Sequence, residues 1–211
     1  MKELTLSGLE EILQILEDTY RETTTALNFT TPFQLLVSTM LAAQSTDVRV
    51  NIVTKDLFRR YPDAQKISAM SIEEMEEAIK TVGLFHTKAK NVLATSKILA
   101  ENYNGEIPET REELMQLPGV GRKTANVVLS ISKDFPAIAV DTHVFRVSNR
   151  IGLANADNVL ETEKQLMEVI PQEKWSAAHH WLIWHGRKIC KARNPLCPEC
   201  PVKEYCKYVN S

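Results

Sequence analysis

Residues 110–132 read TREELMQLPGVGRKTANVVLSIS. Two segments with helical spacing of apolar residues flank the turn formed by residues 117–121. Glycine permits backbone torsions that are closed to other residues and leaves its amide unshielded. The turn and the first amides of the second helix can therefore face a phosphate group. On this pentapeptide alone, a turn that binds no ligand is an equal alternative.

The same helical pattern continues in both directions from the turn. Apolar residues recur at every third or fourth position, and only 7 glycines occur among 211 residues. The predicted helices span residues 7–22, 32–43, 46–60, 71–81, 86–103, 110–116, 121–133, 142–151, 158–170 and 175–190. One apolar extended run, residues 135–140, precedes Asp141, which lies at the start of the next predicted helix. The predicted fold class is all-α.

The charge of the chain is unevenly distributed. The formal net charge is -2 at pH 7, whereas a nucleic-acid-binding domain is often strongly basic. Residues 184–211 nevertheless carry more basic than acidic side chains, and residues 119–150 are also net basic. DNA responds to local charge, because physiological salt screens charges beyond about 8 Å. A DNA-binding face is therefore allowed, although ordinary solvated lysines explain the pattern slightly better on charge alone.

The N-terminus predicts no targeting or membrane segment. It lacks a charged stretch followed by an apolar one, and nowhere do about 18 uncharged apolar residues run together. We therefore expect a cytoplasmic protein with no membrane contact.

All four cysteines lie near the C-terminus, in the order C-x6-C-x2-C-x5-C: Cys190, Cys197, Cys200 and Cys206. Without a secretion signal, this clustering favours a metal centre over disulfides. Zinc ribbons usually contain two C-x2-C pairs, whereas this chain has one pair with unequally spaced outer cysteines, which favours a [4Fe-4S] cluster. The loop between the first two cysteines carries Lys191 and Arg193 and could present cations to phosphates. A cluster that only staples the C-terminal segment is also compatible with this pattern.

Two further polar residues follow the turn. Lys123 lies in the first turn of the second helix, and Asp141 begins a later helix. On pattern alone, an isolated helical lysine is a solvated side chain and Asp141 is an N-cap.

Several motifs taken together change this interpretation: Leu117–Leu129, Ala139–His143, Ala43–Asp47, Gly83–Phe85, His179–Ile183 and the cysteine spacing. With these motifs, the chain resembles the endonuclease III family of DNA glycosylases with lyase activity over nearly its whole length.

The resemblance implies a two-domain fold and a repair function. Residues 24–133 would form a six-helix domain with a helix-hairpin-helix motif at about 110–132, and residues 1–23 plus 134–211 would form a [4Fe-4S] cluster domain. The implied activity is base-excision repair, in which oxidised pyrimidines are removed and the strand is cut by β-elimination through a lysine Schiff base. The implied partner is double-stranded DNA with oxidised pyrimidines or abasic sites. We expect a monomer that works at the bacterial nucleoid.

The resemblance also implies roles for individual residues. Lys123 would attack C1′ of a flipped nucleotide, and the Asp141 carboxylate would take the proton of the amine and stabilise positive charge on the sugar. Gln44 and Leu84 would fill the gap that the flipped nucleotide leaves. Asp47 and His143 match positions near the pocket. The other expected DNA contacts are Pro118, Gly119, Val120, Gly121, Arg122, Lys191 and Arg193, and the expected cluster ligands are Cys190, Cys197, Cys200 and Cys206.

Two alternatives remain at this point. The adenine-mismatch branch of the superfamily shares the hairpin, the aspartate and the cluster, but it lacks the lysine and carries a glutamate in the helix before the Gln44 position. This chain has Lys123 and no acid between Phe33 and Thr46, so that branch is disfavoured. The second alternative is a non-catalytic DNA-binding adaptor stapled by a metal ion.

Overall fold

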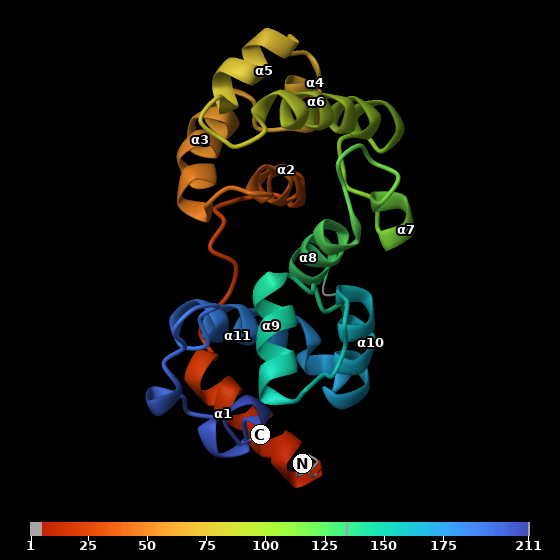
Figure 1. Ribbon diagram of the computed structural model, residues 1–211. Helices are drawn as coiled ribbons and strands as arrows, with labels where there is room; N and C mark the ends of the chain where they lie inside the picture. The colour runs from red at the N-terminus through yellow and green to blue at the C-terminus, as the bar shows by residue number, and fades with distance from the viewer. Residues whose placement is uncertain (1–5, 134, 211) are drawn as a thin grey trace. The chain divides into compact units, whose positions relative to one another are not determined.

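The computed structural model describes residues 6–133 and 135–210, and in these ranges every regular element is a helix (Figure 1). The chain divides into two compact units, Ala26–Phe135 and the combination of Met1–Thr25 with Pro136–Ser211. Both divisions fall two residues after the boundaries drawn from the sequence. The chain enters and leaves the Ala26–Phe135 unit once, so the other unit is assembled from both ends of the sequence.

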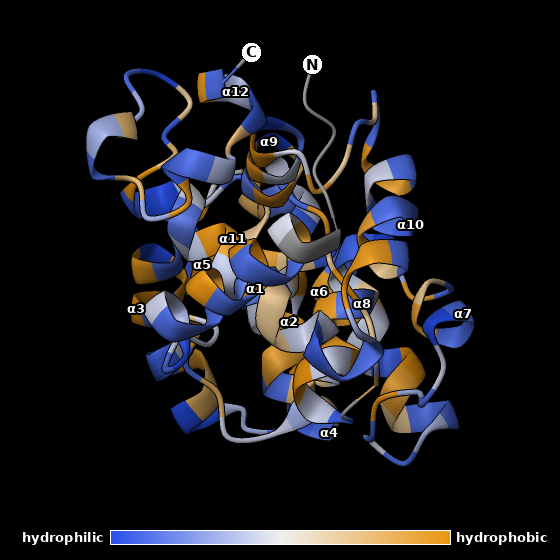
Figure 2. Ribbon diagram, turned by 90° about the horizontal axis from the view of Figure 1, so that it is seen from below, coloured by the Kyte–Doolittle hydropathy of each residue, from blue (hydrophilic) through white to orange (hydrophobic). Residues whose placement is uncertain are grey.

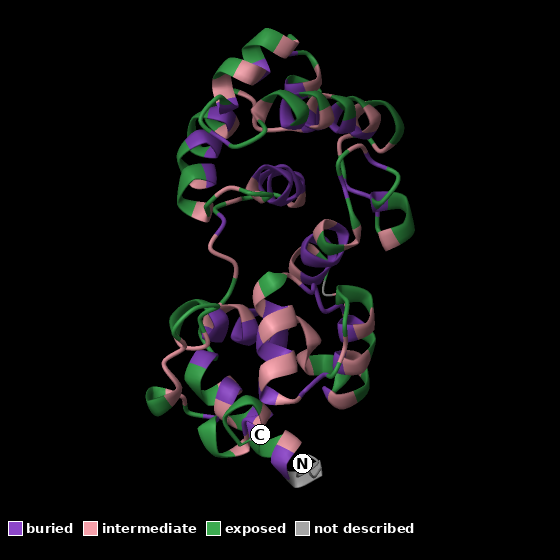
Figure 3. Cartoon of the chain, in the orientation of Figure 1, coloured by how far each residue is buried: buried purple, intermediate pink, exposed green. Residues whose placement is uncertain are grey.

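The Ala26–Phe135 unit is built around α2 (Pro32–Ala42), in which residues 33–41 are all buried (Figure 3). The helix begins at Thr31, whose side chain accepts a hydrogen bond from the Gln34 amide, with proline at the first helical position. Its neighbours in the core are α3, α6 and α8. The other helices of this unit are α3 (Asp47–Arg60), α4 (Ala64–Ser68), α5 (Ile72–Ile79), α6 (Phe85–Asn102), α7 (Arg111–Leu114) and α8 (Arg122–Ser132).

The second unit is centred on α11 (Trp175–Lys188), which packs against α1 (Leu6–Tyr20) and α9 (Thr142–Ile151). Gly186 lets α9 and α11 approach closely, because a Cβ atom there would lie 3.0 Å from the Cβ of His143 and from Cγ2 of Val147. Orange and blue bands mark α10 (Val159–Val169) in Figure 2, as expected for a helix with one apolar face. The remaining helical turns are η1 (Gln172–Lys174), η2 (Cys197–Glu199), η3 (Lys203–Tyr205) and α12 (Lys207–Asn210).

The predicted helices are present, with ends that differ by a few residues, but α4, α12 and the three short 3-10 turns were not predicted. Helix α4 has five residues and is capped by the Asp63 side chain, so it is too short to show a helical repeat. A reciprocal capping box begins α5, in which the Ser71 and Glu74 side chains each accept a hydrogen bond from the other residue's amide. Among the described residues, no helix is long and apolar enough to cross a membrane.

Candidate functional site

The turn between α7 and α8 has the shape that its glycines predict. Gly119 adopts φ +77°, and a Cβ atom there would lie 2.6 Å from Nδ2 of Asn91. The hydroxyl of Thr95 donates to the Pro118 carbonyl over 3.0 Å, which ties the turn to α6. Glycine is therefore required at position 119 both by the backbone torsion and by the contact with α6.

Only part of the turn is available to a ligand. Val120 is buried, with 6% of its surface exposed, and its amide donates to the Leu117 carbonyl, so it supports the turn from inside. Gly119 and Gly121 are exposed, and a Cβ atom at Gly121 would meet nothing within 4 Å. Gly121 is also the N-cap of α8. The amides of these two glycines are the ones that can face a phosphate.

Lys123 lies on the solvent side of α8, two residues after Gly121, and its side chain is exposed. Arg122 precedes it and is half-buried. The turn and Lys123 therefore both lie at the N-terminal end of α8.

Gln44 and Leu84 are held in unusual backbone conformations in the same unit. Their φ angles are 55° and 58°, in the left-handed region that non-glycine residues seldom adopt. Gln44 and Leu84 are both exposed, and 59% of the Leu84 surface is accessible. The Gly83 amide donates to Oγ of Ser45 over 3.1 Å, so the loop before α3 and the loop before α6 are in contact. An exposed leucine on a strained loop is typical of a functional position rather than of a core residue.

Asp141 is the N-cap of α9 in the other unit. Its Oδ1 accepts hydrogen bonds from the amides of His143 and Val144, each of 2.8 Å. Both amide bonds use the same oxygen, which leaves Oδ2 for another donor. The N-cap predicted at Asp141 is thus confirmed. This cap is compatible with a second role for the carboxylate.

His143 follows Asp141 by two residues, and Asp47 follows Gln44 by three residues. The guanidinium of Arg146 donates to Nδ1 of His143 over 3.1 Å, which leaves the ring proton on Nε2 when the ring is neutral. Burial lowers the pKa of His143, while the Asp141 charge opposes the shift. Asp47 is the first residue of α3, directly after the N-cap Thr46.

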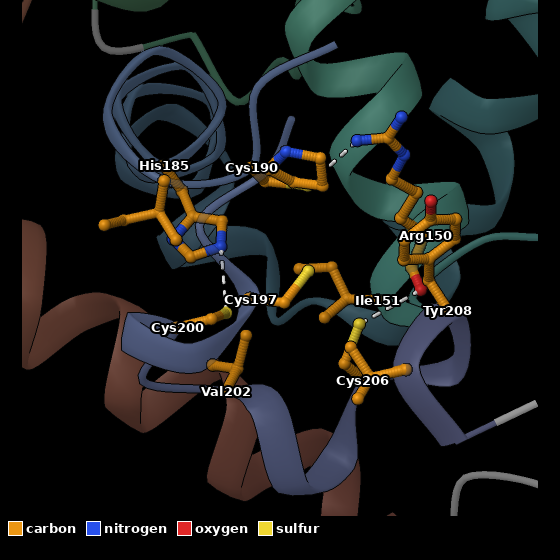
Figure 4. Close-up of a pocket in the computed structure, with 12 residues that line it drawn as sticks. Arg150, Ile151, His185, Cys190, Cys197, Cys200, Val202, Cys206 and Tyr208 are labelled. Atoms are coloured by element: carbon orange, nitrogen blue, oxygen red, sulfur yellow. Dashed lines mark hydrogen bonds between the residues drawn. The ribbon is translucent and has the colours of Figure 1, made fainter. Parts of the chain in front are cut away.

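The four cysteines line one cavity, with an empty volume of about 320 Å³ including its open mouth (Figure 4). Cys197 and Cys200 lie on and just after η2, and Cys206 lies between η3 and α12. The rest of the lining is mainly apolar and comes from α9, α11, α12 and the loops near the C-terminus: Arg150, Ile151, His185, Ile189, Pro195, Val202, Tyr208 and Val209.

The chemistry of this donor set fits an iron-sulfur cluster. Burial, together with the charges of the three other cysteines, raises the pKa of the Cys200 thiol to about 11. Thiolates around one cavity repel one another, so they require a cationic centre. Among the described residues, no three cysteine, histidine or carboxylate side chains form a site for a single metal ion. The four cysteines would instead hold a larger cluster in the cavity that they line.

Hydrogen bonds surround the cysteine sulfurs (Figure 4). Nε2 of His185 lies 3.6 Å from Sγ of Cys200, and Nη1 of Arg150 lies 3.7 Å from Sγ of Cys190. Donors to ligand sulfurs tune a metal centre and orient its ligands. Neither residue was singled out from the sequence, because each lies on a helix far along the chain from the cysteine it contacts.

The basic loop after Cys190 is held by Arg150. This guanidinium donates to the Lys191 carbonyl over 2.7 Å and to the Ala192 carbonyl over 3.1 Å. Lys191 and Arg193 themselves are exposed. The carbonyls of the loop therefore face the protein, and the two basic side chains are accessible to an anion.

The predicted residues thus fall into two groups. The glycine turn, Lys123, Gln44 and Leu84 belong to the Ala26–Phe135 unit. Asp141, His143, the cysteines and the basic loop belong to the other unit. Lys88 was not predicted as a functional residue, yet it is buried with 6% of its surface exposed and contacts the loop that contains Gln44. Its neighbour Lys90 is exposed, and nothing in the sequence separates the two.

Comparison with known proteins gives two family matches. The model of the HhH-GPD superfamily base excision DNA repair proteins matches residues 37–172, and the iron-sulfur binding domain of endonuclease III matches residues 190–206. The second match begins and ends at a cysteine of the cavity.

Individual proteins match along nearly the whole chain. Endonuclease III of Rickettsia felis is 50% identical over 204 residues, which cover 96% of this chain and 95% of that protein. Endonuclease III of Bacillus subtilis is 48% identical over 205 residues, covering 97% and 94% respectively. A solved structure of a trapped endonuclease III-DNA covalent intermediate is 46% identical, covers 98% of each chain and superimposes with a TM-score of 0.93.

Proposed function

Because this chain belongs to the endonuclease III family of base-excision DNA repair proteins, we propose that Lys123 and Asp141 remove oxidised pyrimidines from duplex DNA and cleave the strand. The family activity is that of a DNA glycosylase and AP lyase, and its cofactor is a [4Fe-4S] cluster. The observation that carries the proposal is the exposed position of Lys123 in the first turn of α8, two residues after a turn with two exposed glycines whose amides can hold a phosphate.

The proposed reaction begins with the amine of Lys123. Nζ attacks C1′ of the flipped nucleotide, and the damaged base leaves with the bonding electrons of its glycosidic bond. The ring-opened sugar then forms an iminium with Lys123, loses a proton from C2′ and expels the 3′ phosphate by β-elimination. An amine attacks only in its neutral form, and Lys123 is exposed in the described chain. The bound nucleotide must therefore displace the water around the amine.

Asp141 is proposed to assist both the attack of the Lys123 amine and the departure of the base. A carboxylate can accept the proton that the amine releases and can stabilise positive charge as it develops on the sugar. The N-cap bonds keep Oδ1 occupied by the amides of α9, so the proton acceptor would be Oδ2. These two amide bonds also restrict rotation of the carboxylate.

The remaining predicted residues are proposed to bind and open the DNA. Amides of the glycine turn bind phosphate without reading sequence, and Lys191 and Arg193 add positive charge. Gln44 and Leu84 fill the space that the flipped nucleotide vacates. The cysteines at positions 190, 197, 200 and 206 hold the cluster. When bound, the cluster joins four thiolates and so fixes the loop that carries the two basic residues.

Borohydride trapping tests this proposal. Wild-type protein with its cluster intact should give a covalent adduct with duplex DNA that contains an oxidised pyrimidine, because borohydride reduces the iminium to a stable amine. Lys123→Ala should give no adduct. Lys133→Ala, which removes another lysine at the opposite end of α8, is the matched control and should be trapped as wild type is.

The absence of an adduct from wild-type protein would reject the lyase assignment. If such protein still bound the damaged duplex, the non-catalytic adaptor would be the better description. An adduct that persists in Lys123→Ala would reject the choice of nucleophile.

A further inference from the structure

Lys88 has a buried ammonium group whose hydrogen-bonding capacity is fully used within the Ala26–Phe135 unit. Nζ donates to the Leu41 carbonyl over 2.8 Å, to the Ala43 carbonyl over 2.5 Å and to Oγ of Ser45 over 3.2 Å. A lysine ammonium has three donors, and each of them has one acceptor here. A buried charge is tolerated only when it is satisfied in this way.

These acceptors surround the end of α2 and the residue that follows it. The last carbonyls of a helix lack partners within the helix and carry partial negative charge, which a cation stabilises. The Leu41 carbonyl belongs to the last turn of α2, and Ala43 is its C-cap. Ala43 and Ser45 are the two neighbours of Gln44, so the ammonium binds the chain on both sides of that strained residue.

The main chain of Lys88 is bonded to the other strained loop. Its amide donates to the Leu84 carbonyl over 3.1 Å in the first turn of α6. Leu84 is the N-cap of that helix and has no side-chain capping bond. One residue therefore connects Leu84 through its backbone and both neighbours of Gln44 through its side chain.

The two loops also touch directly. Oγ of Ser45 accepts from the Gly83 amide as well as from Lys88. A Cβ atom at Gly83 would lie 3.1 Å from the Gln44 carbonyl oxygen, so a larger residue would push the loops apart. The contact between the loops is thus tight, and Lys88 and Ser45 lie at its centre.

We propose that Lys88 is a positioning residue that locks Gln44 and Leu84 into one preformed wedge for entry into the DNA duplex. The proposal rests on the roles of Gln44 and Leu84 given under the proposed function. The left-handed φ angles of Gln44 and Leu84 are unfavourable for residues with a side chain. Such backbone strain persists only where surrounding contacts impose it. Burial lowers the pKa of Lys88, as expected for an amine that is removed from water. Without these contacts the two loops would relax. The free energy needed to order them again would then add to the cost of opening the duplex.

The test compares a substrate that must be opened with one that is already open. The first is a fully paired duplex with an oxidised pyrimidine, and the second is an abasic site within an unpaired bubble. Lys88→Met keeps the length of the side chain and removes the three donors. Lys97→Met is the matched control, because Lys97 lies on the same helix with 67% of its side chain exposed. Borohydride trapping rates on both substrates are measured with cluster-loaded protein.

Lys88→Met should slow trapping on the paired duplex roughly tenfold or more, the range expected when hydrogen bonds from a charged group are lost. Trapping at the bubble should fall less than about twofold, because little stacking energy remains to be overcome there. Fluorescence of 2-aminopurine placed beside the lesion should rise more slowly for Lys88→Met than for wild type. Lys97→Met should match wild type in all three measurements.

Wild-type rates for Lys88→Met on the paired duplex, or equal losses on both substrates, would overturn the proposal, since equal losses indicate only a role in folding. If Lys88→Met does not fold, Ser45→Ala removes one acceptor and should show the same selective loss to a smaller degree; an unselective effect there would also overturn it. Failure of the underlying function is distinguishable, because then wild type itself would not be trapped on either substrate.

Discussion

Asp141 combines a structural and a chemical role in one side chain. Its Oδ1 caps α9 through two amide bonds, and this accounts for the N-cap pattern in the sequence. Its Oδ2 is the oxygen proposed to receive a proton. Separate oxygens serve the two roles. A substitution that keeps the helix cap and removes the negative charge can therefore test the chemical role alone. Asparagine is such a substitution, since it caps helices about as well as aspartate but is neutral.

Asp141→Asn should fold and bind damaged duplex nearly as wild type does, while excision slows by about 10²-fold or more, as expected for loss of a charge that stabilises the transition state. Single-turnover excision and a binding titration on the same duplex measure the two effects. Asp141→Ala is the companion variant, and loss of its cap should also lower the free energy of unfolding by about 1 kcal/mol. Near-normal excision by Asp141→Asn would mean that the carboxylate has been misassigned.

The turn between α7 and α8 shows that two glycines in one motif can be required for different reasons. Gly119 has a left-handed φ and lies against Asn91, so its backbone and its surroundings both exclude a side chain. Gly121 has φ -92°, which any residue can adopt, and it faces open space. The fold therefore gives no reason for glycine at position 121. The proposed approach of a phosphate to this exposed end of α8 does give one.

The two alanine variants should differ accordingly. Gly119→Ala should lower the free energy of unfolding by about 1–3 kcal/mol, because it combines strain with a steric clash. Gly121→Ala should change stability by less than about 1 kcal/mol but weaken binding to undamaged and damaged duplex alike, because phosphate contacts carry no sequence information. Urea unfolding and salt-dependent binding titrations distinguish these outcomes. Unchanged DNA affinity of Gly121→Ala would contradict a phosphate site at this turn.

At the scale of the whole molecule, both ends of the chain meet in one unit whose core contains buried histidines. Burial lowers the pKa of His180 and of His185 to about 4. Nδ1 of His185 contacts the Tyr20 hydroxyl from α1 at 3.0 Å, and its Nε2 faces Cys200. The imidazole of His185 therefore connects the N-terminal helix α1 to the cysteine loop. Because both buried histidines are neutral, this unit should be sensitive to acid.

The stability of the protein should fall as the pH drops from 7 to 5. The unfolded chain binds a proton at His180 near the ordinary value of 6.5, whereas the folded chain does not until about pH 4, so acid favours unfolding across that window. This one residue should contribute a loss of about 2 kcal/mol between pH 7 and pH 5. Urea midpoints at the two pH values should therefore shift less in His180→Gln than in wild type. Equal shifts in the two proteins would show that His180 is not buried in its neutral form.

Local interactions explain what could be predicted from the sequence. Helical periodicity, the N-cap at Asp141 and the glycine turn all depend on residues within a few positions of one another, and all are found in the structure. The cysteine spacing is likewise local. Together with the motif resemblance, these features were enough to predict an all-helical fold, a repair activity and an iron-sulfur centre.

Packing between distant segments determines the features that could not be predicted from the sequence. Lys88 looks like any surface lysine in its own helix, and only the approach of α6 to the end of α2, 43 to 47 residues earlier, buries it among carbonyls. The same holds for Val120, which looks like an exposed turn residue but is buried, and for Arg150 beside the Cys190 loop. A side chain's burial depends on which helices pack around it. No short stretch of the sequence contains that information.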